Sequence, residues 1–176
     1  MTARLLHYSA VPIGGIHHKA QGEKRFYNFK PEGLWVSVEG GDPCWDEWCR
    51  SEGFRDHDQY YVYEAHLTDG AKILRLNSAS DIIAFSDQFL KPNRYDEGLL
   101  HDDGVIMANW APVAEQYEGI IIAPYQWSLR LDNRVSWYYS WDCASGCIWS
   151  AHAVELSLVR EPLKKGKHDA EIRDQA

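Results

Sequence analysis

The sequence predicts a single α+β domain built on a mostly antiparallel, split β-sheet with short helices. Three observations lead to this fold class. Strand-like runs rich in aromatic and β-branched residues recur along the chain, the helical patterns are short, and no regular strand-helix-strand repeat appears. A length of 176 residues suits one domain, which we assign to residues 1–163. Residues 164–176 alternate basic and acidic side chains, and we expect them to form a charged, flexible tail.

The first half of the chain contains strand patterns and one short helix. Residues 5–9 and 34–38 form short apolar runs next to turn-forming Pro and Gly residues, so we expect two strands. A helix over about 43–52 follows, because two tryptophans and a cysteine recur there at three- and four-residue spacing. Residues 60–67 alternate as a strand does, and an Asp-Gly turn leads into 72–76. This pair predicts a hairpin.

Two helices and a buried strand are predicted next. Residues 78–81 form a helix cap, and the apolar side chains that follow it up to Phe89 recur on one helical face. A second helix is expected over about 105–117, with a bend or a break at Pro112. Three isoleucines at 120–122, closed by a proline, indicate a central strand that is buried on both faces.

The remaining residues read as further strands. The runs 137–141 and 147–150 flank the small residues 144–146, which we interpret as a turn between two strands. Residues 153–159 alternate in polarity, and we expect them to close the sheet. The chain contains 8 Trp and 10 Tyr, and this aromatic content suits a fold with an aromatic-lined cleft.

Charge and composition exclude several classes of function. A formal net charge of -8 argues against a broad surface for duplex DNA, although a few basic and aromatic side chains could still hold a nucleic acid locally. No apolar run reaches transmembrane length and no signal-like segment begins the chain, so we expect a cytoplasmic protein without a membrane partner. The four cysteines are then reduced thiols. Their spacing does not fit a zinc site, and we predict no metal.

The chemistry-bearing residues lie on three predicted strands. The chain has no phosphate loop, dinucleotide-binding glycine fingerprint, HExxH helix or nucleophile elbow. What remains is His7-Tyr8-Ser9 on the first strand, Trp35 and Ser37 on the second, and Glu118 at the head of the isoleucine strand. A strand fixes the backbone of such an acid while its side chain reaches a cleft.

Each of these residues also has a structural interpretation. Glu118 could end a strand in solvent, His7 could be a hydrogen-bonded core histidine, and Trp35 could serve packing alone. Glu115 lies three residues before Glu118 and is the alternative acid, although we expect it on the solvated last turn of a helix.

In this order, the motifs His-Tyr-Ser, Gly-Leu-Trp-Val-Ser and Tyr-Glu-Gly-Ile-Ile-Ile resemble the three signature regions of ADP-ribosyltransferases of the diphtheria-toxin and poly(ADP-ribose) polymerase type. The resemblance covers about residues 4–123 in outline and does not extend beyond Tyr125. Trp35 stands where the family usually has a tyrosine. A small member of this family would suit a toxin or a phage–host conflict protein.

The resemblance implies NAD as co-substrate and a role for each residue. Glu118 would be the catalytic carboxylate, His7, Tyr8 and Ser9 would bind the ribose side, and Trp35 with Ser37 would lie near the nicotinamide. A fixed carboxylate stabilises the positive charge that develops on the ribose when its bond to nicotinamide breaks.

The acceptor and the oligomeric state stay open at the level of the sequence. The acceptor of the ADP-ribose would be a macromolecule, either a protein or a nucleic acid. Three basic residues could pair with the pyrophosphate of NAD, namely Lys30, Arg75 and Arg130. Two alternatives are a non-catalytic module that binds a nucleotide or single-stranded nucleic acid in an aromatic cleft, and an NAD glycohydrolase.

Overall fold

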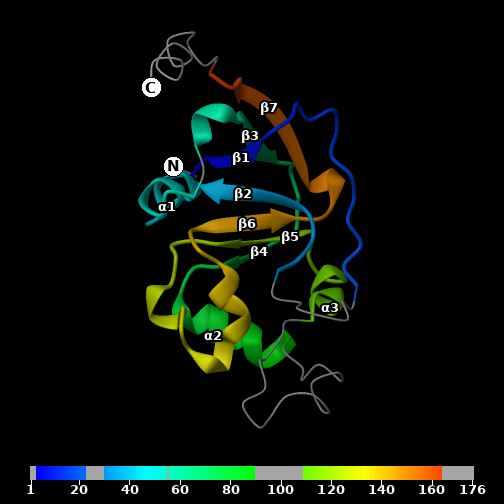
Figure 1. The fold of residues 1–176 in the computed structure, drawn as a ribbon. Helices are drawn as coiled ribbons and strands as arrows, with labels where there is room; N and C mark the ends of the chain where they lie inside the picture. The colour runs from blue at the N-terminus through cyan, green and yellow to red at the C-terminus, as the bar shows by residue number, and fades with distance from the viewer. Residues whose placement is uncertain (1–2, 23–29, 55, 90–108, 164–176) are drawn as a thin grey trace.

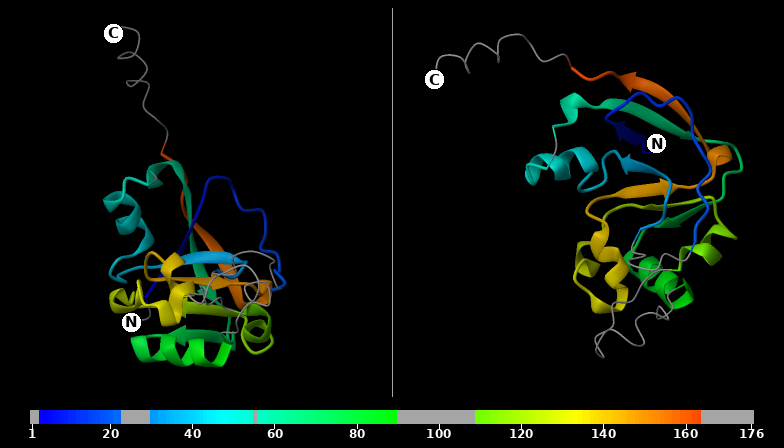
Figure 2. Two further views of the ribbon diagram at one scale, coloured as in Figure 1. Left: turned by 60° about the horizontal axis from the view of Figure 1, so that its bottom comes forward. Right: turned by 45° about the vertical axis from the view of Figure 1, so that its right-hand side comes forward.

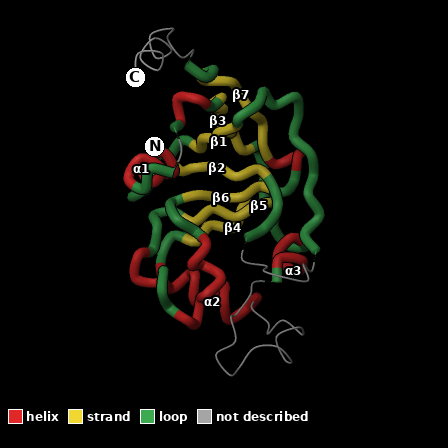
Figure 3. Tube along the Cα trace, viewed as in Figure 1, coloured by secondary structure: helices red, strands yellow, loops and turns green. Residues whose placement is uncertain are grey.

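The protein folds around one seven-stranded mixed sheet. The structure is a computed structural model that describes residues 3–22, 30–54, 56–89 and 109–163. Along the sheet the strand order is β4-β5-β6-β2-β1-β3-β7, and Figure 3 shows these strands in yellow. The strands are β1 (Leu5–Ser9), β2 (Leu34–Val38), β3 (Tyr61–Leu67), β4 (Ile73–Leu76), β5 (Gly119–Ile122), β6 (Ser145–Ile148) and β7 (Val154–Arg160).

All neighbouring strands are antiparallel except β4 and β5, which are parallel. A parallel pair needs a crossover, and α2 (Ala79–Phe89) and α3 (Trp110–Ala114) lie on the segment between these two strands. The third α-helix is α1 (Trp45–Ser51), which follows β2. The described residues also include four short 3₁₀ segments, η1 (His57–Gln59), η2 (Trp127–Leu129), η3 (Asn133–Ser140) and η4 (Ala151–Ala153).

Helix α2 and the 3₁₀ segment η3 lie together at one end of the sheet, whereas α1 lies beside β2 (Figure 1). In Figure 1, α2 and the yellow segment that contains η3 lie beside β4, β5 and β6, whereas β3 and β7 form the opposite end. Figure 2 shows that the sheet twists strongly from β4 to β7, as β-sheets of L-amino acids do. The contact between η3 and α2 is aromatic, with the rings of Phe85 and Trp137 centred 5.0 Å apart, and Trp137 Nε1–H donates to Ser86 Oγ at 2.9 Å.

The isoleucine strand is the centre of the core, as predicted. Ile120, Ile121 and Ile122 are 0%, 2% and 0% exposed. β5 lies between β4 and β6, so both of its edges are hydrogen-bonded and its two faces are covered. A strand buried in this way carries apolar side chains at consecutive positions.

The sheet is split between β1 and β2. β1 pairs with β3 along its whole length, from Leu5 to Ser9, but it pairs with β2 only at Leu5 and Leu6. Beyond Leu6 the two strands separate, while β2 continues to pair with β6 from Leu34 to Ser37. The separation leaves a gap in the middle of the sheet rather than at one of its edges.

The structure confirms the α+β class, the mostly antiparallel sheet and several elements, and corrects two others. The predicted hairpin is wrong, because β3 pairs with β1 and β7 while β4 pairs with β5. Residues 137–141 are not a strand, since most of them belong to η3, and the supposed turn at 144–146 lies largely in β6. Aromatic runs have strand propensity, but here tertiary packing against α2 overrides it.

One further expectation is met only in part, and another concerns residues outside the described part of the chain. The helix predicted for 105–117 is observed as the shorter α3, and the first residues of the expected range lie outside the described residues, as does the charged tail at 164–176. In the described part of the chain, no helix has the length and apolarity that a membrane span requires.

Candidate ligand-binding site

A pocket opens where β1 and β2 separate. Its volume is about 300 Å³, at the lower end of the usual range for small-molecule sites. We call it the split pocket. Consecutive residues of both strands line it, so both faces of the sheet contribute, as expected at a gap between strands. The lining residues are Leu6, His7, Tyr8, Lys30, Trp35, Val36, Ser37, Trp45, Asp142, Cys143 and Ser145.

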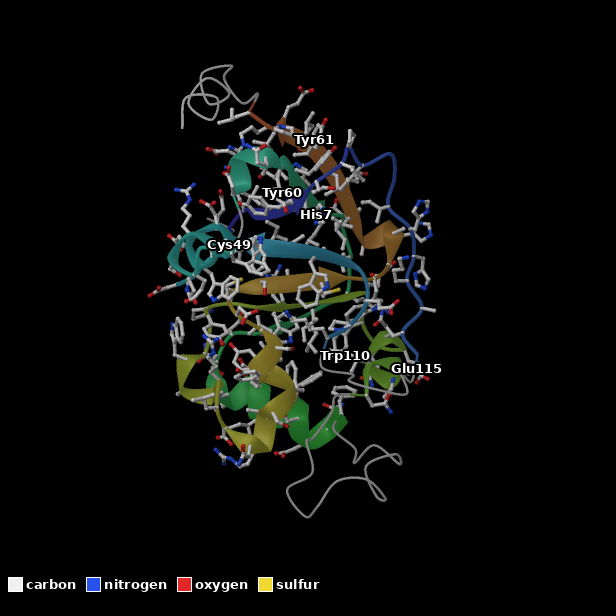
Figure 4. The ribbon with its side chains drawn as sticks, in the orientation of Figure 1. His7, Cys49, Tyr60, Tyr61, Trp110 and Glu115 are labelled. Atoms are coloured by element: carbon white, nitrogen blue, oxygen red, sulfur yellow. The ribbon has the colours of Figure 1, made fainter. Side chains whose placement is uncertain are left out.

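His7 bridges the gap between the strands. Its Nδ1 lies 2.6 Å from the carbonyl oxygen of Trp35, and Figure 4 labels His7 on β1 next to β2. A carbonyl only accepts, so Nδ1 carries the proton and Nε2 is left as a hydrogen-bond acceptor. Burial lowers the pKa of His7 below 6.5, and the bond to Trp35 opposes this shift. The imidazole is therefore neutral at pH 7.

Trp35 lies between a cation and another indole. Lys30 Nζ is 5.1 Å from the centre of one of its rings, and the ring of Trp141 is centred 4.9 Å away at an interplanar angle of 60°. Burial lowers the pKa of Lys30, and the charge of Asp142 opposes this shift. A planar cation that stacked on Trp35 would compete with the Lys30 ammonium for the ring.

The two predicted serines have structural partners. Ser37 lines the split pocket and is buried, and its Oγ accepts a hydrogen bond from the backbone N–H of Trp45 at 2.9 Å. This contact fixes the start of α1 against β2 and brings Trp45 to the pocket. Ser9 does not line the pocket. Its hydroxyl donates to the carbonyl of Val11 at 2.7 Å and closes a local turn.

Asp142 is the carboxylate of the split pocket. It precedes β6, and its two oxygens lie 4.0 Å from Lys30 Nζ and 3.7 Å from Arg130 Nη2. Both distances are longer than a hydrogen bond. Burial raises the pKa of Asp142, while Lys30 and Arg130 lower it. The sequence analysis did not select this residue.

Glu118 does not line the split pocket. One of its carboxylate oxygens accepts from the backbone N–H of Lys72 at 2.9 Å, and the other accepts from Ser150 Oγ at 3.1 Å. Its backbone N–H donates to the Lys72 carbonyl, and its own carbonyl accepts from Trp149 and Ser150. Glu118 therefore joins the beginnings of β4 and β5 to the end of β6.

The alternative acid and the three predicted basic residues lie in different parts of the structure. Glu115 is exposed at the end of α3, as expected, and Figure 4 shows it on the outer side of that helix. Lys30 lines the split pocket and Arg130 reaches Asp142. Arg75 instead lines a second concavity of about 510 Å³, together with Arg4 and His66.

Two buried donors have no hydrogen-bond partner in the described part of the chain. They are the hydroxyl of Tyr125 and Nε1–H of Trp141. Burial raises the pKa of Tyr125 to about 12, and the charges of Arg130 and Asp142 act on it in opposite directions. Buried polar groups usually have hydrogen-bond partners, so these two donors are exceptions.

A metal is not suggested by the described residues, among which no three His, Cys, Asp or Glu side chains form a cluster that could hold one. None of the four cysteines, all of which lie in the described part of the chain, forms a disulfide, and burial raises the pKa of Cys143 in the split pocket to about 12. This thiol is therefore protonated and a poor nucleophile.

The signal that could have indicated Asp142 was present in the sequence. From residue 133 to residue 154 it is the only acidic residue, and aromatic, small and apolar residues surround it. A lone acid in such a run is either exposed at a turn or buried at a site where its charge has a structural or functional role.

Comparisons with protein-family models, curated proteins and solved structures found no match to this chain.

Proposed function

We propose that the protein binds the nicotinamide-ribose end of NAD in the split pocket and transfers ADP-ribose to a macromolecular acceptor, with release of nicotinamide. One observation carries this proposal. Four of the five residues that the family resemblance assigns to NAD, namely His7, Tyr8, Trp35 and Ser37, line one pocket at the point where the sheet splits. They come from two strands that are separated in the sequence by more than twenty residues.

The reaction is a displacement at the first carbon of the ribose. The bond from this carbon to the nicotinamide nitrogen breaks, and its electron pair leaves with nicotinamide. An oxygen or nitrogen of the acceptor then forms the new bond to the ribose and releases a proton. The transition state is positively charged at the ribose, so a nearby carboxylate stabilises it.

His7 has the hydrogen-bonding state that this function requires. With Nδ1–H fixed on the Trp35 carbonyl, Nε2 can accept a hydrogen bond from a ribose hydroxyl, and the neutral ring does not repel the cationic nicotinamide. His7 acts here as a clamp and not as a proton shuttle.

Lys30 is the residue that a bound nicotinamide must displace. Its ammonium lies over Trp35, where the cationic ring would stack, and the side chain is long enough to swing toward the pyrophosphate. The pyrophosphate is an anion and a better partner for the ammonium than the indole. A Lys30→Met variant is then expected to bind NAD more weakly, despite the freed ring.

A second candidate function is nucleotide binding without cleavage. The observation that favours it concerns Glu118, whose two carboxylate oxygens are both engaged in hydrogen bonds within the fold. If Glu118 were the only possible acid, the pocket would hold a nucleotide without a group to stabilise the departing nicotinamide.

Incubation with NAD separates these functions. Nicotinamide release is followed by chromatography with the protein alone and with added cell lysate, and NAD binding is followed by tryptophan fluorescence. Transferase activity predicts release that rises with lysate and label that becomes attached to macromolecules. Release that is indifferent to lysate indicates a glycohydrolase, and binding without release indicates the binding module.

A further inference from the structure

We infer that Asp142, and not Glu118, is the carboxylate that contacts the ribose and stabilises the departure of nicotinamide. This inference rests on the proposed function and names the catalytic acid for it. Three independent observations support the assignment, and they concern position, availability and surroundings.

The first observation is position. Asp142 lines the split pocket together with His7, Tyr8 and Trp35, whereas Glu118 is not among the lining residues. The acid must contact the ribose that these side chains hold, and a carboxylate outside the pocket cannot do so without a movement of β5. All four residues of that strand are buried.

The second observation is availability. Glu118 accepts hydrogen bonds at 2.9 and 3.1 Å through its two oxygens. The Asp142 carboxylate has no hydrogen bond from the residues that the structure describes, and Lys30 and Arg130 lie 4.0 and 3.7 Å from its oxygens. The charge of Glu52 also acts on it, in the opposite sense to the two cations. Its lone pairs are therefore open to a ribose hydroxyl, while the two cations keep it near a defined position.

The third observation is the surroundings of the acid. Trp141, the neighbour of Asp142 in the chain, packs on Trp35, and Nε1–H of Trp141 is buried without a partner among the described residues, as is the Tyr125 hydroxyl. The Asp142 side chain is 25% exposed, and partial burial of this kind strengthens the attraction of a carboxylate for a developing positive charge relative to water.

The reaction remains balanced with Asp142 in this role. The carboxylate forms no covalent bond, and it stabilises the cationic ribose while the electron pair of the broken bond leaves with nicotinamide. The acceptor hydroxyl or amine, or water in its absence, supplies the new bond to the ribose and loses one proton.

The test compares three single variants of the full chain, namely Asp142→Asn, Glu118→Gln and the exposed control Glu115→Gln. NAD binding is measured by tryptophan fluorescence, nicotinamide release by chromatography, and folding by thermal melting. We expect Asp142→Asn to lower the release rate about 100-fold or more, with an NAD dissociation constant within a few-fold of the wild type. Glu118→Gln and Glu115→Gln should keep rates near the wild-type value.

The outcomes separate the inference from the proposed function. A large loss in Glu118→Gln with near-normal release in Asp142→Asn overturns the inference and leaves the function standing. A wild-type protein that binds or cleaves no NAD overturns both.

A further variant covers the case in which Asp142→Asn does not fold. Asp142→Glu keeps the charge and both ion pairs but displaces the carboxylate by about the length of one methylene, and displacements of this size cost about 100-fold in rate. A folded Asp142→Glu protein with the full wild-type rate contradicts the inference.

Discussion

At the scale of single residues, two carboxylates and one imidazole have distinct states. His7 is neutral and tied to the Trp35 carbonyl, Glu118 is occupied by two hydrogen bonds, and Asp142 is held between cations without a hydrogen bond from the described residues. These states follow from where each backbone position lies in the sheet. Because the states differ, a substitution at each residue is expected to change the folding stability in a different way.

The first prediction concerns His7 and pH. Burial lowers the pKa of His7 in the folded protein, so the unfolded chain takes up the proton first as the solution becomes acidic. Folding stability from this group is complete above its ordinary pKa of 6.5 and is lost as the pH falls from there through the lower folded value. The slope is at most about 1.4 kcal/mol per pH unit.

Urea denaturation between about pH 5 and 8 measures this effect. The variant His7→Gln has no titrating group at this position, so the difference in stability between wild type and variant should shrink as the pH falls. A difference that stays constant over this range would show that His7 titrates as it does in the unfolded chain.

The second prediction concerns Glu118 as a structural residue. Glu118→Ala leaves the Lys72 amide and the Ser150 hydroxyl without their acceptor, which costs about 1–3 kcal/mol of unfolding free energy. Glu118→Gln retains a carbonyl oxygen for Lys72 and should lose less. The exposed control Glu115→Ala should change stability by less than about 0.5 kcal/mol. Equal stabilities for Glu118→Ala and the wild type would contradict this role.

The sequence could supply only part of the site. The placement of His7, Tyr8, Trp35 and Ser37 on two short strands was predictable from apolar runs next to turn residues, and the structure brings these four residues to one pocket. Glu118 was selected because it begins the most apolar strand, but the sequence does not reveal the Lys72 and Ser150 partners. The pairing of strands that are distant in sequence brings Lys72 and Ser150 to Glu118.

At the scale of elements, β6 determines which acid reaches the pocket. It lies between β5 and β2, so it separates Glu118 from the strand that carries Trp35 and places Asp142 near that strand instead. Small residues favour turns, which is why residues 144–146 suggest a turn in the sequence. In the structure, Gly146 lies in β6, where the neighbouring strand β5 leaves no space for a side chain.

The third prediction tests this close packing at Gly146. A Cβ at this position would lie 2.6 Å from the Ile120 carbonyl oxygen and 2.7 Å from Ile121 Cγ1. Gly146→Ala must therefore displace the backbone of β5 or β6, and overpacking of this kind costs about 1–3 kcal/mol. The matched control is Gly15→Ala, where a Cβ meets no atom within 4 Å. Urea midpoints that are equal for the two variants would contradict the packing argument.

At the scale of the whole molecule, the gap between β1 and β2 is the feature that creates the split pocket. The fold class and most of the strands could be predicted from residue patterns, because burial requires either alternating or continuous apolar residues along a strand. The strand order did not follow, since the parallel pairing of β4 with β5 and the place of β6 depend on contacts between distant segments. The pocket is a product of that order.

The most direct test of the account is hydrogen exchange of the full chain with and without a non-cleavable NAD analogue, in which a methylene group replaces the ring oxygen of the nicotinamide ribose. We expect slower exchange in peptides that contain β1, β2 and Asp142, the segments that line the split pocket. Unchanged exchange there, or protection confined to the concavity around Arg75 and His66, would contradict the assignment of NAD to the split pocket.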